Sequence, residues 1–408
     1  MDVFFYSHRT DLIVNAGPLQ HIPVQSSEIC DRIIRTGLLS ADELYRVQQA
    51  IAGQVQHRIS LLRRRATEGY HAYNPDRQSL RFRDHGQSPA RELQFVQATE
   101  QLMTLAGFQH LDPMSIKHSL HQVSPFGLNL NIHLRDFELL RIYTRDQALR
   151  LEWRRDWRRL FLARTRLQVP VYRRLVLIFK LKCRDHLIRD RMILCGQSYR
   201  TAARFVQRYY RHLPQTGFDQ YIYLKLFKDT PQDDIEMLLP NRGVRMKLFD
   251  KIKLGLSGTG SITAGIYAAI KKLLFTTFNP MTLVITLGTL GGAIVQQITK
   301  YLAQRNTYLR YLSEALYFHT LAGNRSVISH IGEQAADELT KQTLLVYFII
   351  RRSGITPDAP ALQQQARTLL CDWFGVDVTV DPHAALTLLQ TVRLESKVSE
   401  PVQIDDTD

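Results

Sequence analysis

LGLSGTGSITAGIYAAI, residues 254–270, is the first of two uncharged runs that decide the expected fold. The second is LLFTTFNPMTLVITLGTLGGAIVQQIT, residues 273–299, and only Lys271 and Lys272 separate the two runs. After Pro280 the second run leaves about 28 Å of helix at 1.5 Å per residue, which matches a hydrocarbon core of roughly 30 Å. The pattern therefore predicts a two-helix transmembrane hairpin over residues 254–299.

Small residues recur four positions apart in both runs. Those expected to pack one helix on the other are Gly260, Ala264, Gly265, Gly288 and Gly292. Small side chains let two helices approach closely in lipid, where hydrophobicity does not drive helix association. Three alternatives stay open: a buried hairpin of a soluble protein, a glycine-rich segment that inserts on demand, and a single span over residues 281–299.

Basic residues are concentrated on the outer flanks of the hairpin. They are Arg242, Arg245, Lys247, Lys251 and Lys253 before it and Lys300, Arg305 and Arg310 after it. Because basic residues favour the cytoplasmic side, both flanking parts are expected on that side of the membrane. The start, MDVFFYSHRTD, has neither the charge nor the apolar run of a secretory signal.

Hydrophobic periodicity on both sides of the hairpin predicts an α+β fold class. Helices are expected from the capping-box residue Ser40 to Gly69, over residues 89–107, 184–213, 301–321 and 333–352, and from Pro382 to Leu389. Strands are expected over residues 128–132, 137–143, 169–182 and 221–227. The expected parts are an N-terminal helical region (1–125), an α+β basic region (126–253), the hairpin (254–299) and a C-terminal helical region (300–408).

The composition excludes a transporter built mostly from membrane spans, because 22% of residues are charged and the mean hydropathy is -0.20. The four cysteines form no CxxC pair, which excludes a disulfide scaffold and a zinc knuckle, so reduced and mostly buried thiols are expected. The net charge of +15 is strongly basic. Such a charge suits anionic lipid or nucleic acid as a partner.

The segment WRRDWRRLFLARTR, residues 153–166, interleaves arginines with aromatic residues. Its candidate lipid-facing arginines are Arg154, Arg155, Arg158, Arg159, Arg164 and Arg166. This pattern is typical of a face apposed to a membrane and also of a nucleic-acid surface. Anionic headgroups are the favoured partner, a nucleic-acid module over residues 150–211 is the alternative, and a plain solvated face also fits.

A dense alternation of charge precedes the hairpin. The juxtamembrane charge cluster consists of Lys225, Lys228, Asp229, Asp233, Asp234 and Glu236. It could bind a headgroup or a metal ion, serve a membrane-surface hydrolase or transferase, or form ion pairs that lock a domain to its stem. No phosphate-binding loop or nucleophile elbow occurs, and His118 and His121 lack a third ligand at recognisable spacing. No catalytic residue, metal or cofactor is therefore predicted.

Several blocks carry a family resemblance: YLKLFKDTPQDDIEMLLPNRGVRMKLFDKIKLG (223–255), HIPVQSSEI (21–29), FGLNLNIHLRDFELL (126–140), VPVYRRLVLIFKLK (169–182) and NTYLRYLSEALYFHTLAGNRSVI (306–328). The chain resembles the family typified by transmembrane protein 143, whose domain has no known function. Residues 184–213 look like an insertion beyond the shared pattern. The resemblance implies a membrane protein with about two spans, mitochondrial in eukaryotic members, and no established activity.

Because no mitochondrial presequence is visible, a bacterial inner membrane is the expected location, with a mitochondrial membrane as the alternative. The expected function is that of a membrane-anchored structural or interaction protein. Its expected partners are the lipid bilayer with its anionic headgroups, and a protein partner or a second copy of the chain.

Overall fold

The computed structural model describes residues 13–76, 88–112, 129–130, 136–155, 164–210, 218–232, 235–239, 244–245, 299, 319–355 and 357–398. The chain divides into two units. The first combines Met1–Lys117, Leu134–Gln232 and His319–Asp408, and the second combines His118–His133 and Asp233–Phe318. In the second unit, β3 (Asn129–Leu130) pairs with β7 (Val244–Arg245), and α7 spans Ile235–Leu238. All features below lie in the first unit unless stated otherwise.

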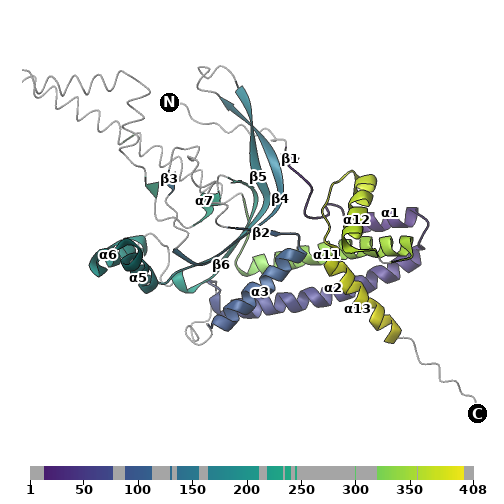
Figure 1. The fold of residues 1–408 in the computed structure, drawn as a ribbon, viewed down its shortest axis with the longest axis horizontal. Helices are drawn as coiled ribbons and strands as arrows, with labels where there is room; N and C mark the ends of the chain where they lie inside the picture. Colours follow the sequence, from purple (N-terminus) through teal and green to yellow (C-terminus); the bar gives the residue numbers. More distant parts are fainter. Residues whose placement is uncertain are drawn as a thin grey trace, which may run out of the picture. The chain divides into compact units, whose positions relative to one another are not determined.

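An antiparallel sheet forms the framework of the first unit (Figure 1). Its strand order is β1-β4-β5-β6-β8, and β2 also pairs with β4. The strands are β1 (Ile13–Asn15), β2 (Gln109–Leu111), β4 (Phe137–Arg155), β5 (Arg164–Leu181), β6 (Tyr223–Pro231) and β8 (Thr320–Gly323). Tyr143, Val176 and Leu226 stand opposite one another on neighbouring strands and are buried, so one sheet face adjoins the helical core.

Helices supply the rest of the core. They are α1 (Ser26–Arg35), α2 (Ala41–Tyr70), α3 (Pro89–Leu105), α11 (Arg325–Ser353), α12 (Ala359–Phe374) and α13 (Pro382–Val398), with short 3-10 turns at His71–Tyr73 and Phe218–Gln220. Helix α11 contacts all five of the others and buries most of its second half. The Ser40 hydroxyl accepts from the Glu43 amide, which confirms the predicted start of α2.

Helices α2 and α3 approach each other closely at Gly69, where a Cβ atom would lie 2.8 Å from both the Arg91 carbonyl oxygen and the Phe95 nitrogen. Gly53, in the same helix, has open space around it. We expect Gly69→Ala to lower the free energy of unfolding by about 1–3 kcal/mol through backbone displacement. Gly53→Ala should raise it by about 0.5–1 kcal/mol, because alanine favours helix more than glycine does. Urea denaturation of both variants tests this, and changes of the same sign would contradict the close approach.

The predicted fold class is wrong in its membrane part. The structure is a mixed α/β fold on an antiparallel sheet, and no helix within the described ranges is both long and apolar enough to cross a bilayer. The long helix α11 has an apolar second half but buries Glu338 and Lys341 in its middle, so it packs as a core helix. The hairpin predicted over residues 254–299 lies outside the described residues apart from Thr299.

Several element predictions need correction. Strand β4 runs far beyond the predicted 137–143, and β5 begins at Arg164 instead of residue 169 and ends at Leu181. Each strand supplies the other's backbone partners as far as Arg155 and Arg164. Leu321 was predicted in a helix but lies in β8, which pairs with the edge of β6. Pairing between distant segments here outweighs the local helical pattern.

The cysteines also differ from expectation. All four are free, but only Cys30 is buried; Cys183 is half-buried, and Cys195 and Cys371 are exposed. Burial raises the pKa of the Cys30 thiol, so this side chain acts as a small apolar group in the core. The prediction that the thiols are mostly buried is therefore wrong.

Candidate functional site

Two aspartates adopt a left-handed backbone at the same level of the sheet. Asp146 in β4 has φ 58°, and Asp229 in β6 has φ 47°. Both aspartates stand opposite Arg173 of β5, one on each side. Tyr172 and Arg174, the residues before and after Arg173, are paired with both β4 and β6, whereas Arg173 itself is skipped in both ladders. Aspartate tolerates this conformation better than most residues, but it still carries strain of about 1 kcal/mol or more.

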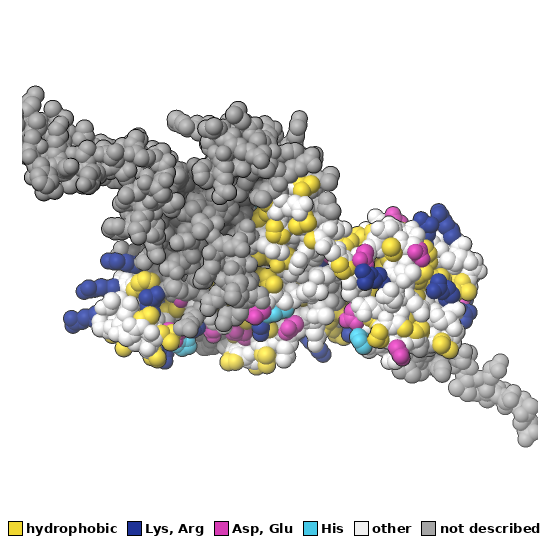
Figure 2. Space-filling model, turned by 45° about the horizontal axis from the view of Figure 1, so that its top comes forward, with side chains coloured by type: hydrophobic (Ala, Val, Ile, Leu, Met, Phe, Trp, Pro, Cys, Tyr) yellow, Lys and Arg dark blue, Asp and Glu magenta, His cyan; other side chains and the backbone are white. Residues whose placement is uncertain are grey.

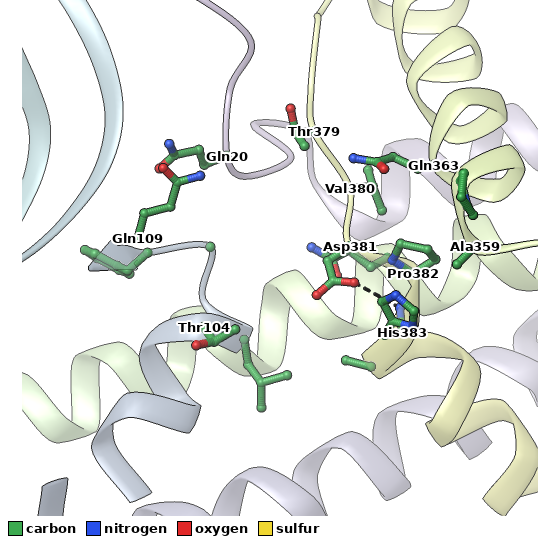
Figure 3. Close-up of a pocket in the computed structure, with 16 residues that line it drawn as sticks. Gln20, Thr104, Gln109, Ala359, Gln363, Thr379, Val380, Asp381, Pro382 and His383 are labelled. Carbon is green, nitrogen blue, oxygen red and sulfur yellow. Dashed lines mark hydrogen bonds between the residues drawn. The ribbon is translucent and has the colours of Figure 1, made fainter. Parts of the chain in front are cut away.

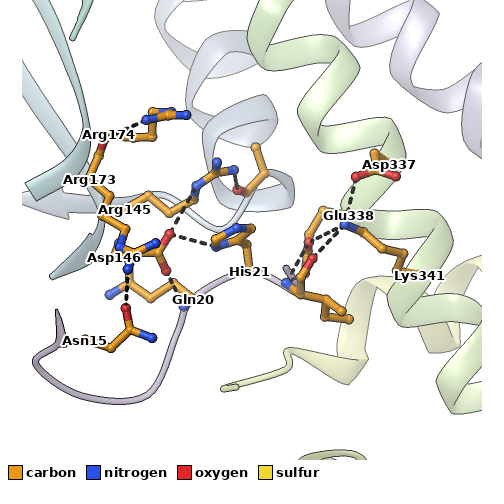
Figure 4. A network of polar contacts seen from close by, with 12 residues as sticks. Asn15, Gln20, His21, Arg145, Asp146, Arg173, Arg174, Asp337, Glu338 and Lys341 are labelled. Carbon is orange, nitrogen blue, oxygen red and sulfur yellow. Dashed lines mark hydrogen bonds and ion pairs between the residues drawn. The ribbon is translucent and has the colours of Figure 1, made fainter. Parts of the chain in front are cut away.

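Asp146 is buried and joins the sheet to the segment that precedes α1 (Figure 4). Its Oδ1 accepts from the Gln20 amide at 2.8 Å, and its Oδ2 lies 2.7 Å from His21 Nδ1 and 3.6 Å from Arg145 Nε. Burial alone would raise the pKa of Asp146, but His21, the Gln20 amide and Arg145 together hold it below its usual value. The carboxylate is therefore stabilised in its charged form.

A second buried group holds the same segment to α11. Both carboxylate oxygens of Glu338 accept from the Ile22 amide, at 3.1 and 3.2 Å, and Lys341 Nζ donates to the Ile22 carbonyl at 2.7 Å. Lys341 also lies 2.7 Å from Asp337 and 3.7 Å from Glu338. Burial raises the pKa of Glu338, and the nearby Lys341 and hydrogen bonds offset only part of that effect. We call Gln20–Ile22 with Asp146, Glu338 and Lys341 the buried clamp.

A cavity of about 350 Å³ adjoins the buried clamp (Figure 3). Gln20 and Gln342 belong to its wall, and Gln342 donates to Glu338 at 2.9 Å. The remaining polar lining is mainly neutral amide and hydroxyl, from Gln109, Gln363, Thr104 and Thr379. Asp381 also lines the cavity, but its carboxylate accepts from the His383 amide and caps α13. His383 and several apolar side chains complete the lining, so the cavity wall mixes neutral polar, ionisable and apolar groups.

Helices α5 (Arg184–Cys195) and α6 (Tyr199–Tyr210) form a strongly basic pair. Ala202 and Val206 are buried on one face of α6, whereas Arg200, Arg204 and Arg208 follow one another at four-residue spacing on the opposite, exposed face. With Arg184 and Arg189 on α5 they make five exposed arginines, and none has an ion-pair partner among the described residues. Figure 2 shows Lys and Arg side chains projecting from this part of the molecule, at the left.

The turn between α5 and α6 exposes apolar side chains. Ile193 is 79% exposed, Leu194 57% and Tyr199 62%, and Met192 is also exposed. Gly196 ends α5 with φ 59°, a left-handed conformation that lets the chain reverse within three residues. We call Met192–Tyr199 the α5–α6 tip, and Arg184, Arg189, Arg200, Arg204 and Arg208 the basic face.

The structure brings together only part of the predicted charge cluster. Lys225, Lys228 and Asp229 lie on β6, and the Lys228 carbonyl oxygen is 2.8 Å from His319 Nδ1. Asp233 and Asp234 lie outside the described residues, and Glu236 belongs to α7 in the second unit, where its side chain is not described. A shared site for all six side chains stays a prediction.

The other predicted sites also stay predictions. Of the lipid-facing arginines, Arg154, Arg155, Arg164 and Arg166 occupy the far ends of β4 and β5, with side chains that are not described, and Arg158 and Arg159 lie outside the described residues. The small residues Gly260, Ala264, Gly265, Gly288 and Gly292 lie outside them too, as do His118 and His121. No group of His, Cys, Asp and Glu suited to a metal ion occurs within the described ranges.

Sequence reasoning missed both the buried clamp and the α5–α6 tip. The signal for the clamp was Glu338 and Lys341, two opposite charges three residues apart, just before the apolar run of residues 344–350. The signal for the tip was MILC, four apolar residues directly before Gly196 inside a basic segment. Both signals are short, so neither stands out from ordinary helix patterning.

Comparison with known proteins gives a partial family match. No solved structure matches the chain. Residues 172–326 match the model of a family described as a protein of unknown function (DUF3754). The match begins in β5 and ends in the first turn of α11, so it includes the basic face, the α5–α6 tip and Asp229. Over this part of its length, the chain is similar to a family whose function is unknown.

Proposed function

We propose that this protein is a structural or interaction protein that works at an anionic membrane surface. The observation that carries the proposal is the stripe of Arg200, Arg204 and Arg208 along the exposed face of α6. Like charges four residues apart on a helix destabilise it by about 0.2–0.5 kcal/mol per pair. An anionic surface removes that repulsion, and each arginine near such a surface contributes about 1 kcal/mol of binding free energy.

Two further features support this proposal. The net charge of +15 favours association with anionic surfaces in general. The buried carboxylates of Asp146 and Glu338 hold backbone and side-chain partners inside the fold, which suits a structural role for them. The resemblance to the family of transmembrane protein 143, itself still a prediction, agrees with work at a membrane.

The proposal is tested by replacing Arg200, Arg204 and Arg208 together with glutamine in the full chain. We expect the triple variant to bind phosphatidylserine-containing vesicles about a hundredfold more weakly than the wild type, because three charges near the surface are lost. Vesicle flotation measures the bound fraction. Since the three side chains are exposed, circular dichroism should show an unchanged fold.

A charge-matched control replaces Arg35, Arg46 and Arg65, which are exposed on α1 and α2, with glutamine. This control should bind nearly as the wild type does. Equal loss in both variants would mean that only net charge matters and would contradict a specific basic face. Binding to duplex DNA that exceeds binding to vesicles would favour the nucleic-acid alternative over the membrane.

A further inference from the structure

The α5–α6 tip exposes several apolar side chains that are adjacent in the sequence, which is unusual for a protein surface. Met192, Ile193 and Leu194 follow one another at the end of α5, so their side chains spread over about 200° of the helix circumference. No single packing face within the protein could bury all three. Single exposed apolar residues are normal on protein surfaces, but a group of adjacent ones marks a contact site.

Charge surrounds the tip in a definite order. Arg189 lies one helical turn before Ile193 on α5, and Arg200 directly follows Tyr199 at the start of α6. Arg204 lies four residues after Arg200, or about 6 Å further from the tip along the axis. Asp190, the acidic residue nearest to the tip on α5, is paired with Lys182 at 2.7 Å. Apolar side chains therefore occupy the end of the helix pair, and arginines lie on both helices within about one turn behind them.

We propose that the α5–α6 tip inserts into the interfacial region of an anionic lipid bilayer, an inference that rests on the proposed function. Met192, Ile193 and Leu194 enter the acyl boundary and Tyr199 lies at the headgroup level. The three arginines of the basic face that lie within about one turn of the tip, Arg189, Arg200 and Arg204, contact the phosphates. This order matches the profile of a bilayer, which is apolar inside and anionic at its surface. Twelve-residue helices are about 18 Å long and too short to span it, so the insertion is shallow.

The fold holds the two helices in the geometry that insertion requires. Leu187 and Ile188 of α5 and Ala202 and Val206 of α6 are buried. The Arg191 guanidinium carbon lies 3.4 Å from the centroid of the Phe205 ring, which ties α5 to α6 just behind the tip. Because the pair is preformed, little ordering of the protein accompanies binding.

The test replaces Ile193 and Leu194 with serine in the full chain. The matched control replaces Leu61 and Leu93, which are 43% and 57% exposed on α2 and α3, with serine. Binding to phosphatidylserine-containing vesicles is measured by flotation at low and high salt. We expect the tip variant to bind about tenfold more weakly or worse and to lose all binding that survives high salt, because salt screens charge but not apolar insertion. The control should bind as the wild type does.

A second measurement keeps Ile193 and Leu194 in place, so it tests the insertion even if the serine variant does not fold. An environment-sensitive fluorophore on the exposed Cys195, in a background with Cys183→Ser and Cys371→Ser, should shift its emission to the blue when anionic vesicles are added. The insertion is wrong, while the proposed function stands, if the wild type binds these vesicles, the serine variant binds them equally well, and the emission of the fluorophore does not shift. If the wild type does not bind them at all, the proposed function fails as well. If the wild type is a dimer and the tip variant is a monomer, the tip would instead be a contact surface for a second copy of the chain.

Discussion

Replacing Lys341 with methionine is expected to lower the free energy of unfolding by about 3 kcal/mol or more, the usual effect of removing one partner of a buried charge pair. Methionine fills the space of the lysine stem but cannot donate to the Ile22 carbonyl or offset the charge of Glu338. Urea denaturation at neutral pH measures the change. A loss below about 0.5 kcal/mol, the range of ordinary surface substitutions, would show that Lys341 does not hold the clamp.

The control for this prediction is the double variant Glu338→Gln with Lys341→Met. It removes both charges and should recover part of the stability lost in the single variant, since no buried charge stays unpaired. The pH dependence gives a second check. Burial raises the folded pKa of Glu338, so its contribution to stability is largest at acid pH and falls as the pH rises through that folded pKa. Lys341→Met should enlarge this fall and extend it to higher pH, because the nearby lysine no longer lowers the pKa of Glu338, and Glu338→Gln should abolish it.

Asp146→Ala is expected to lower the free energy of unfolding by about 2–4 kcal/mol, because buried donors lose their acceptor and alanine is placed at a positive φ. The lost contacts are those with the Gln20 amide, His21 and Arg145. Asp146→Asn is the matched control, since asparagine tolerates the left-handed backbone and keeps one oxygen for the Gln20 amide. It should lose clearly less stability than the alanine variant.

The same pair of variants separates charge from geometry. The folded pKa of Asp146 is lowered, so its charge contributes stability above its usual pKa, and that stability is lost as the pH falls through the folded pKa. The asparagine variant should lack this acid-dependent loss. Equal stability of the alanine and asparagine variants at neutral pH would contradict the role assigned to the backbone conformation.

Local sequence signals predicted the elements that local interactions specify. Ser40 and Glu43 gave the start of α2, and Pro89 gave the start of α3. They could not give the lengths of β4 and β5 or the existence of β8, because those depend on pairing between distant segments. The apolar runs at 254–299 dominated the predicted fold class, whereas the described core depends on an antiparallel sheet packed with helices such as α11.

The candidate sites were less predictable than the fold. The buried clamp joins Ile22 to Glu338 across 316 positions of sequence, and no local pattern encodes such a contact. The basic character of residues 184–213 was visible, but the exposure of Ile193 follows from how α5 and α6 pack, with Leu187 and Val206 buried instead. Burial decides which apolar residues are core and which form a contact surface, and burial is a tertiary property.

Association with an anionic membrane surface is tested most directly by measuring how the wild-type chain binds vesicles that differ only in lipid charge. Flotation with phosphatidylcholine vesicles is compared with flotation after part of the lipid is replaced by phosphatidylserine, over a series of salt concentrations. We expect strong binding only to the anionic vesicles; this binding should weaken as salt rises, with a fraction that survives high salt. Equal binding to both kinds of vesicle, or binding to neither, would contradict it.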